Sequence, residues 1–281
     1  MRIVLASSTG HVQLKVGARK LGLTCVSSKK VAEALPSDVL CSYTLWDGSA
    51  RQRLARNVYL PAGARVLCVD LSWIRELPAS VQCGWLLPYG VGINGSGVFP
   101  AGTLSRWESF GLQCRPWREG GEFVLVCGNK GSMYAKRSVW LNHDDSWVDS
   151  TITELRTHTK LPIYYKPHPI TREGKAPLLP SVKVDKVLPY DMPLESCLPG
   201  AHCMVVYASS SATTALLNGI PVVYTGPTIM TKDLCSRGLA SVAKPYLPDN
   251  REEVFARLSG SVWRLSEVAS GDMFKHFGIG V

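Results

Sequence analysis

Short apolar runs alternate with amphipathic stretches along the first half of the chain. Residues 2–6 form an apolar run of strand length, and the spacing of apolar positions from there to Leu21 is helical. Further strand-like runs occur at residues 38–42 and 65–70, with a helical pattern over residues 49–58 between them. This order predicts an α/β domain built on an open, largely parallel sheet.

The same alternation starts again after the Gly120-Gly121 pair, where residues 122–127 form an apolar run. Beyond it the pattern predicts strands at residues 163–166, 182–187, 204–207 and 222–224 and helices at residues 138–159, 193–198, 212–217 and 250–265. We therefore predict an α/β fold of two Rossmann-like domains, residues 1–121 and 122–281, that face each other across a cleft.

The charge of the chain is positive and unevenly distributed. Lys and Arg number 31 against 22 Asp and Glu, which gives a net charge of +9. Residues 1–122 hold 14 basic and 8 acidic side chains, so this half carries most of the excess. A basic half suits a polyanionic partner such as nucleic acid, although a general solubilising charge would explain the same excess.

The nine cysteines show neither a disulfide framework nor a zinc site. Their number is odd, C-x-x-C is absent, and several lie inside apolar runs, such as Cys68 and Cys127. Reduced, buried thiols of this kind are typical of a cytoplasmic protein. The chain also begins without a signal-peptide pattern and has no apolar segment of membrane-spanning length, so we expect a cytoplasmic location and no membrane partner.

Residues 161–227 contain the strongest chemical signal. A predicted strand ends at Lys166 and is followed by His168 between two prolines, which hold the ring on a stiff loop. Further along, Ser209-Ser210-Ser211 lies between a strand and a helix. Hydroxyl and amide groups at a helix start bind anions, so the two loops predict a nucleotide phosphate site. The plainer alternatives are a structural loop histidine and ordinary helix capping by the serines.

A glycine-bounded turn at residues 128–132 follows the first strand of the second series. Its Asn129 and Lys130 could approach a diphosphate, or the segment could be a simple tight turn. The spacing G-x-x-x-x-G-K-[ST] of a P-loop is absent.

These motifs resemble the C-terminal domain of GT-B glycosyltransferases. The resemblance rests on Lys166-Pro167-His168-Pro169, the serine triplet and Gly219-Ile220-Pro221-Val222. The pattern is similar to that of the capsule-polysaccharide, sialyl-, Kdo- and CDP-glycerol-transferase branches of this group. In those branches the His-Pro and Ser motifs bind the donor nucleotide and its phosphate. Lys166 stands where the family pattern has arginine, and Thr214 where it often has an acid. The predicted donor contacts are Lys166, His168, Pro169, Ser209, Ser210, Ser211, Asn129 and Lys130.

A wider pattern is similar to phage-encoded glycosyltransferase-like proteins of DNA base hypermodification. It includes Asn94-Gly95-Ser96-Gly97, Arg106-Trp107 and residues 115–121. This resemblance implies that the acceptor is a hydroxymethylated pyrimidine base in double-stranded phage DNA, inside a phage-infected host cell.

Sugar transfer needs a group that stabilises the leaving phosphate and a base that deprotonates the acceptor hydroxyl. His168 is the candidate for the first role. Asp70, at a strand end, and His11, after the first strand, are candidates for the second, with Asp47 as a further alternative. A strand-end Asp is also a common turn cap. The sequence has no D-x-D and no His/Cys cluster, so we predict a metal-independent enzyme.

Arginine and tryptophan are interleaved in the first half of the chain, where five of the eight tryptophans fall within residues 1–122. In a DNA-acting transferase, guanidinium groups would grip phosphates and aromatic rings would stack on an extruded base. Tryptophans of a buried core are the plainer alternative. The predicted acceptor contacts are Arg51, Arg53, Arg106, Trp107, Arg115 and Arg118.

Together these features predict a GT-B-type, nucleotide-sugar-dependent glycosyltransferase that modifies a base of phage DNA. We expect no tightly bound cofactor and a UDP-sugar as the preferred co-substrate, with CMP- and GDP-sugars as alternatives. A glycosyltransferase acting on a capsule or cell-wall polysaccharide is the alternative enzyme. A non-catalytic DNA-binding protein with a nucleotide-type fold is the alternative from another class.

Overall fold

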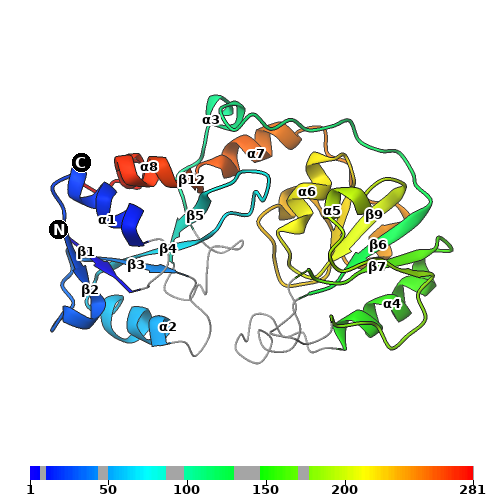
Figure 1. Ribbon diagram of the computed structural model, residues 1–281, viewed down its shortest axis with the longest axis horizontal. Helices are drawn as coiled ribbons and strands as arrows, with labels where there is room; N and C mark the ends of the chain where they lie inside the picture. The colour runs from blue at the N-terminus through cyan, green and yellow to red at the C-terminus, as the bar shows by residue number, and fades with distance from the viewer. Residues whose placement is uncertain (7–10, 44–49, 87–97, 130–145, 170–176, 281) are drawn as a thin grey trace. The chain divides into compact units, whose positions relative to one another are not determined.

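The computed structural model describes residues 1–6, 11–43, 50–86, 98–129, 146–169 and 177–280. The chain divides into two compact units, and each is described by itself (Figure 1). Unit 1 comprises Met1–Trp73, Leu77–Phe110 and Phe255–Val281, and unit 2 comprises Ile74–Glu76 and Gly111–Val254.

Unit 1 is built on a six-stranded sheet in the order β12-β5-β4-β3-β1-β2. Its strands are β1 (Arg2–Leu5), β2 (Thr24–Ser27), β3 (Val39–Tyr43), β4 (Arg65–Leu71), β5 (Ser80–Trp85) and β12 (Val262–Arg264). The pairs among β1 to β4 are parallel, whereas β5 is antiparallel to both of its neighbours. Its helices are α1 (His11–Lys20), η1 (Ser28–Lys30), α2 (Ala50–Leu54), η2 (Ala55–Tyr59), α3 (Leu104–Glu108), α8 (Leu265–Ser270) and α9 (Asp272–His276).

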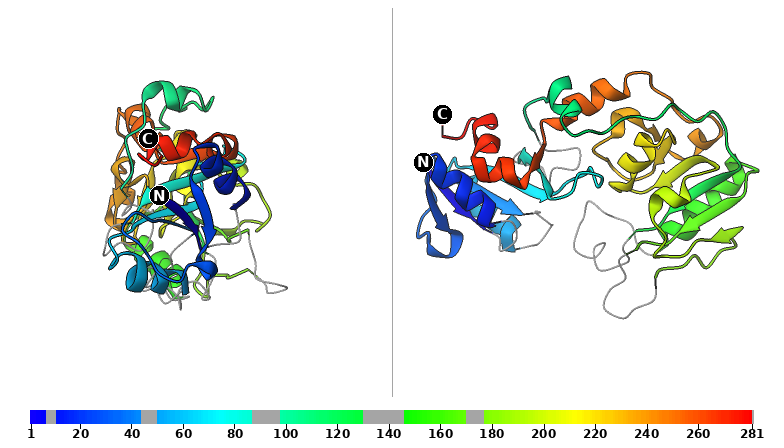
Figure 2. Two further views of the ribbon diagram at one scale, coloured as in Figure 1. Left: turned by 90° about the vertical axis from the view of Figure 1, so that its left-hand side faces the viewer. Right: turned by 45° about the horizontal axis from the view of Figure 1, so that its top comes forward.

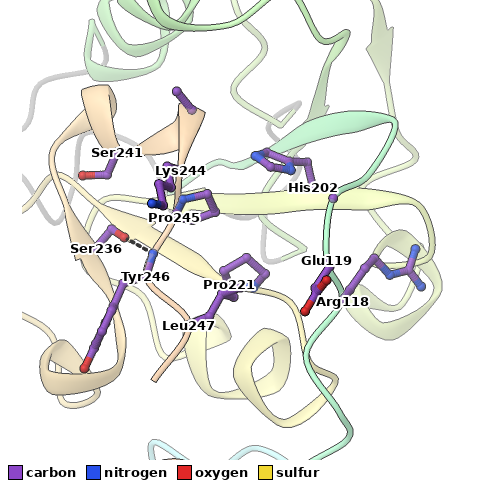
Figure 3. Close-up of a pocket in the computed structure, with 12 residues that line it drawn as sticks. Arg118, Glu119, His202, Pro221, Ser236, Ser241, Lys244, Pro245, Tyr246 and Leu247 are labelled. Carbon is purple, nitrogen blue, oxygen red and sulfur yellow. Dashed lines mark hydrogen bonds between the residues drawn. The ribbon is translucent and has the colours of Figure 1, made fainter. Parts of the chain in front are cut away.

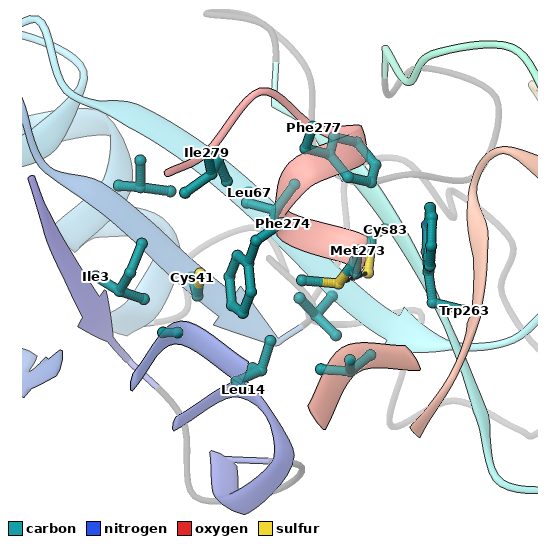
Figure 4. Packing of buried hydrophobic residues seen from close by; sticks show 14 of the residues in the cluster. Ile3, Leu14, Cys41, Leu67, Cys83, Trp263, Met273, Phe274, Phe277 and Ile279 are labelled. Atoms are coloured by element: carbon teal, nitrogen blue, oxygen red, sulfur yellow. Dashed lines mark hydrogen bonds between the residues drawn. The ribbon is translucent and has the colours of Figure 1, made fainter. Parts of the chain in front are cut away.

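The core of unit 1 joins the two ends of the chain. Ile3 and Leu67 of the sheet share one cluster of buried apolar residues with Met273 and Phe274 of α9 (Figure 4). Helices α1 and α8 lie side by side, as Figures 1 and 2 show from several directions. Gly17 permits this approach, since a Cβ atom there would lie 1.9 Å from the carbonyl oxygen of Val268.

Unit 2 is built on a six-stranded sheet in the order β11-β10-β9-β6-β7-β8, with every pair parallel. Its strands are β6 (Phe123–Cys127), β7 (Ile163–Lys166), β8 (Lys186–Val187), β9 (Ala201–Val206), β10 (Val222–Tyr224) and β11 (Ser236–Arg237). Its helices are α4 (Trp147–His158), α5 (Leu194–Cys197), α6 (Ser211–Leu217), η4 (Lys232–Leu234) and η5 (Leu239–Ala243). The chain passes from unit 2 back to unit 1 within α7 (Arg251–Ser259).

The strand order of unit 2 is that of a doubly wound dinucleotide-type fold. The chain adds β7 and β8 on one side of β6, then returns to place β9, β10 and β11 on the other. The strands are buried on both faces because helices cover both faces, so their sequences read as continuous apolar runs and not as alternating ones. The direction of winding reverses between β6 and β9, where ligands bind in folds of this kind.

The prediction of an α/β fold with two Rossmann-like domains is confirmed by the two mostly parallel sheets. The division at 121/122 differs from the compact units, which separate at 110/111 and return residues from Phe255 onward to unit 1. A boundary placed on the Gly120-Gly121 pair misses this return because pairing between distant strands leaves no local mark in the sequence.

The predicted helix over residues 250–265 is wrong in its second half. α7 ends at Ser259, and Val262–Arg264 forms a strand that pairs with β5. Gly260 lies between the two elements at a close approach of the backbone, since a Cβ atom there would lie 2.0 Å from the Pro100 carbonyl oxygen. Strands β2, β5 and β11 were not predicted from the sequence, and of the predicted edge strand at 182–187 only Lys186–Val187 forms.

Replacing Phe274 by alanine tests whether the end of the chain belongs to the core of unit 1. The ring is 0% exposed, so we expect Phe274→Ala to lower the free energy of unfolding by about 3–5 kcal/mol. Urea unfolding measures the change. The matched control is Lys275→Ala, whose ammonium lies 3.7 Å from Asp272 in an exposed pair and should change stability by about 0.5 kcal/mol or less. Equal stability of both variants would contradict this packing.

Candidate active site

Three loops of unit 2 meet at the carboxyl edge of its sheet. Strands β9, β6 and β7 are neighbours and run in the same direction. Ser209 follows β9, Asn129 follows β6 and His168 follows β7, so all three loops leave the sheet at the same edge. In the ladder, Cys127 pairs with Lys166, which aligns the ends of β6 and β7. This edge includes the point where the winding reverses, so the two predicted donor motifs and Asn129 lie where a ligand is expected.

The serine segment is organised by hydrogen bonds within itself. The Ser209 hydroxyl accepts the Ser211 amide at 3.2 Å and also bonds the Ser211 hydroxyl at 2.8 Å. Ser210, directly before α6, uses no side-chain hydrogen bond as a helix cap. All three serines are half-buried. The Ser209 hydroxyl therefore makes a local turn bond before α6, and the N-cap residue Ser210 makes no capping bond, since its hydroxyl takes part in a different contact.

That contact comes from Arg75, which sequence reasoning missed. Its Nε atom donates to the Ser210 hydroxyl oxygen at 3.1 Å. Arg75 belongs to the short segment Ile74–Glu76, which groups with unit 2. A guanidinium beside a hydroxyl-rich loop adds a positive charge and further donors, which a phosphate group requires.

Lys166 lies at the end of β7 and is 5% exposed. Its ammonium donates to the carbonyl oxygens of Pro167 at 3.1 Å and Tyr190 at 2.7 Å. Two of its three donor hydrogens are thereby committed to the protein. Lys166 therefore stabilises the loop that carries His168. The sequence had suggested Lys166 as a cation available to the phosphate, but these internal bonds occupy it. His168 is half-buried and Pro169 is exposed on the same loop.

Two polar atoms near this edge are buried without a hydrogen-bond partner. One is Nδ2 of Asn129, and the other is the hydroxyl of Thr228, in the loop that follows β10. Buried polar groups are normally satisfied, so an orphaned donor beside a ligand edge suggests a partner that arrives with the ligand. Lys130, the other residue predicted for this turn, lies outside the described residues.

The carboxylate of Glu76 is a third buried group without a hydrogen-bond partner, and it too was not predicted from the sequence. Both of its carboxylate oxygens are buried and lack a hydrogen-bond partner. It follows Arg75 directly in the segment that groups with unit 2. A buried carboxylate without a hydrogen-bond partner destabilises a fold, so Glu76 is a candidate catalytic residue. No local motif marks Arg75, Glu76 or Thr228, because their burial and contacts arise only after folding.

The predicted bases Asp70 and His11 lie at the carboxyl edge of the other sheet, in unit 1. Asp70 is near the end of β4, and its carboxylate accepts the Leu71 amide at 2.7 Å. This local bond is the turn-cap role that the sequence left open. His11 begins α1, after β1, and its side chain lies outside the described residues, as does the whole of Asp47. Strands β4 and β1 are separated by β3.

Arg106 and Trp107 are not available to DNA in this structure. The Trp107 ring is 2% exposed and stacks on Phe255 at 4.9 Å. The Arg106 guanidinium contacts the carbonyls of Ser259 and Val262 and the carboxylate of Glu267. Both side chains fasten α3 to the C-terminal segment, so their assignment to the acceptor was wrong, and the core alternative holds for Trp107.

The remaining predicted arginines lie on two different segments. Arg51 and Arg53 belong to α2 of unit 1. Arg115 and Arg118 are exposed on the segment that enters unit 2, where their amides donate to the carbonyls of Leu217 and Gly219 at 2.8 Å. Two of these four arginines thus belong to unit 1 and two to unit 2, and their assignment to an acceptor stays a prediction.

Thiol chemistry finds no support in the cysteines of the site region. Burial raises the pKa of Cys127 to about 12 and that of Cys203 to about 12. Both are therefore protonated and unreactive at neutral pH. Within the described ranges, no three His, Cys, Asp or Glu side chains gather so as to hold a metal ion. The described helices include none with the length and apolar character of a membrane span.

Comparison with known proteins gives a match at the level of structure. No family model and no curated sequence matches the chain. One similar solved structure is the beta Kdo 2,7 transferase of Thermosulfurimonas dismutans KpsC, with a TM-score of 0.54 and 16% identity over 95% of this chain and 97% of that one. Another is the beta Kdo 2,4 transferase of the same KpsC, with a TM-score of 0.61 and 15% identity over 93% and 91%. The likeness extends over nearly the whole length of both chains and supports a fold of the GT-B kind.

Two threonine variants test whether the buried hydroxyl of Thr228 lacks a hydrogen-bond partner within the protein. Thr228→Val removes an unsatisfied group and should raise the free energy of unfolding by about 1 kcal/mol. Thr225→Val is the matched control: its hydroxyl accepts Nε1 of Trp147 at 2.8 Å, so the change should cost about 1–3 kcal/mol. Urea unfolding compares the two. Equal destabilisation by both variants would show that Thr228 already has a partner in the protein.

Proposed function

We propose that this chain is a glycosyltransferase of the GT-B type that moves a sugar from a nucleotide donor to a surface-polysaccharide acceptor. The observation that carries the proposal is the meeting of the His168 loop and the serine segment at one edge of the unit 2 sheet, beside the reversal point. The solved structures that resemble the whole chain are named as transferases of the sugar Kdo.

The donor edge has the chemistry that a leaving nucleotide needs. When the bond between the anomeric carbon and the phosphate oxygen breaks, negative charge develops on the phosphate. His168 can donate a hydrogen bond to it, and the hydroxyls of Ser209 and Ser210 can donate further ones, whereas the Ser211 hydroxyl already donates to Ser209. Arg75 adds positive charge beside Ser210, a role that the sequence analysis had given to Lys166.

The second half of the reaction is attack by an acceptor hydroxyl. Its oxygen forms the new bond to the anomeric carbon, and its proton must pass to a base. Glu76 is the strongest candidate for this base, because its carboxylate oxygens are buried, unpartnered and one residue from Arg75. Asp70 and His11 are the other candidates, at the carboxyl edge of unit 1. We assign the donor domain to unit 2, because it carries the His168 loop and the serine segment, and the acceptor domain to unit 1.

A polysaccharide acceptor fits the chain better than DNA. The burial of Trp107 and the internal bonds of Arg106 remove two residues from the proposed DNA surface. The names of the similar structures refer to sugars as well. The basic excess of residues 1–122 also suits an acidic polysaccharide, since that is a polyanion too.

Replacing His168 by alanine tests the donor site. UDP, CMP and GDP are added to the whole chain, and the melting temperature is followed. The nucleotide of the true donor, at 100 times its Kd, should stabilise the wild type by about 2.7 kcal/mol. His168→Ala should lose about half of this, corresponding to roughly a tenfold weaker Kd.

His158→Ala is the matched control, because His158 ends α4 beside Glu154 and away from the donor edge. An undiminished response of His168→Ala would show that the donor site is misplaced. No response of the wild type to any of the three nucleotides would favour the non-catalytic alternative.

Sugar transfer to two competing acceptors tests the reaction itself. We expect a sugar-sized mass increase on an acidic capsule-type oligosaccharide and none on DNA that contains hydroxymethylpyrimidine bases. Mass spectrometry of both acceptors with UDP-, CMP- and GDP-sugars provides the measurement. Modification of the DNA nucleoside alone would restore the DNA acceptor and overturn the polysaccharide proposal.

In the same assay, Glu76→Gln should lower the rate of transfer by about 10²–10⁴-fold and leave the stabilisation by nucleotide intact, since only the proton acceptor is lost. Glu154→Gln, on the exposed side of α4, serves as the control. Full activity of Glu76→Gln would return the role of base to Asp70 or His11.

A further inference from the structure

The described part of unit 2 also has a pocket, which lies at the amino edge of its sheet, opposite the candidate site (Figure 3). Its volume is about 630 Å³, within the range of sites for small organic ligands. Pro221 precedes β10, His202 is near the start of β9, and Ser236 begins β11, so the amino ends of three neighbouring strands border it. The full lining is Arg118, Glu119, Gly120, His202, Pro221, Ser236, Ser241, Ala243, Lys244, Pro245, Tyr246 and Leu247.

This pocket is separate from the donor edge. β9 runs from Ala201, beside the pocket, to Val206, three residues before Ser209. Five steps of about 3.3 Å place the two ends of this strand roughly 17 Å apart. A nucleotide bound at the serine segment therefore does not account for the pocket.

The charged lining favours an anion with a single charge. Arg118 and Lys244 are exposed cations of the pocket, and Glu119 is the one acid among its described lining residues, so the local charge balance is +1. α6 ends at Leu217, four residues before Pro221, so the negative end of its dipole disfavours any anion at this edge, and the attraction comes from the two cations alone. Pro221 and Pro245 have no amide hydrogen to offer. Among these lining residues no α-helix begins, so a phosphate group does not find the helix start that it prefers, whereas one carboxylate needs only a guanidinium or an ammonium.

The uncharged lining suits the ring and hydroxyls of a sugar. Pro221, Pro245 and Leu247 lie in the middle of the pocket, with Tyr246 on one side and Glu119 on the other (Figure 3). The Tyr246 side chain is 51% exposed, and its backbone is held by a 2.7 Å bond from its amide to the Ser236 hydroxyl. An exposed aromatic ring beside apolar proline faces offers a stacking surface that keeps a polar edge.

The histidine of the pocket is oriented by the backbone. Nε2 of His202 lies 2.9 Å from the carbonyl oxygen of Val242. A carbonyl can only accept, so Nε2 carries the hydrogen, and in the neutral ring Nδ1 is left as an acceptor. Nδ1, the Glu119 carboxylate and the Ser241 hydroxyl can each accept a hydrogen bond from a sugar hydroxyl.

We propose that this pocket binds a carboxylate-bearing sugar unit of a saccharide chain, with its carboxylate attracted by the two exposed cations Arg118 and Lys244 and its ring against Tyr246. The inference rests on the proposed function in one respect: the saccharide is taken to be part of the acceptor polymer, bound away from the reacting end. Such an anchor holds a long acceptor without touching the reacting atoms. It should lower the KM for long acceptors and leave kcat unchanged, because it binds ground state and transition state alike.

Calorimetric titration of the whole chain tests the binding. The probes are an oligosaccharide that contains glucuronic acid and a neutral glucose oligomer of the same length. We expect the acidic probe to bind more tightly, and Arg118→Ala and Lys244→Ala each to weaken it about tenfold, as for the loss of a charged hydrogen bond. Lys160→Ala, which removes an exposed cation outside the pocket, should change the Kd less than twofold.

A nucleotide that stabilises the chain is then added at saturation to separate this site from the donor site. The acidic probe should remain bound, and Tyr246→Ala should weaken the probe without changing the nucleotide response. Equal binding of the acidic and neutral probes, an unchanged Kd in the Arg118 and Lys244 variants, or displacement by the nucleotide would each overturn the proposal. Saccharide binding that depends on Arg118 in a chain that binds no nucleotide would instead sink the proposed transferase and leave the pocket assignment standing.

Discussion

The parallel ladder of unit 2 is the constraint on which the candidate site depends. Hydrogen bonds between β9, β6 and β7 force the ends of these strands into line, as the pairing of Cys127 with Lys166 shows. Segments that are far apart in the sequence, at Asn129, His168 and Ser209, therefore leave the sheet at one edge. Without this ladder the two motifs would be an isolated histidine loop and an isolated helix cap. The same ladder places the amino ends of the strands, and the pocket that they border, at the opposite edge.

The two edges differ in the kind of ligand that they suit. At the carboxyl edge, hydroxyl groups and an arginine gather beside the start of α6, and buried donors lack partners. At the amino edge, prolines, an exposed tyrosine and two exposed cations line a pocket of about 630 Å³. The first combination suits phosphate and the second suits a carboxylated sugar ring, because phosphate needs many converging donors while a sugar ring needs an apolar face as well.

Unit 1 depends on a different long-range feature, the return of the chain end. Phe274 and Met273 fill the core between the sheet and α1, while Arg106 bonds to the carbonyls that border β12. These contacts give structural roles to Arg106 and Trp107, which the sequence pattern had suggested for nucleic acid. An arginine beside a tryptophan has the same local signature in a core network as on a binding surface. Only burial separates the two.

The sequence by itself determined the α/β alternation, most strand positions in unit 2 and the two motifs that leave its sheet at the carboxyl edge. It did so because fully buried parallel strands are apolar throughout, and because a histidine between prolines and a run of serines before a helix are local signals. It could not reveal the return of residues from Phe255 to unit 1, the strand pairing of β12 with β5, or the internal bonds of Lys166. Arg75, Glu76 and Thr228 emerged only in three dimensions. Their importance lies in burial and in partners that are distant or missing, and these are properties of the tertiary structure that no local pattern encodes.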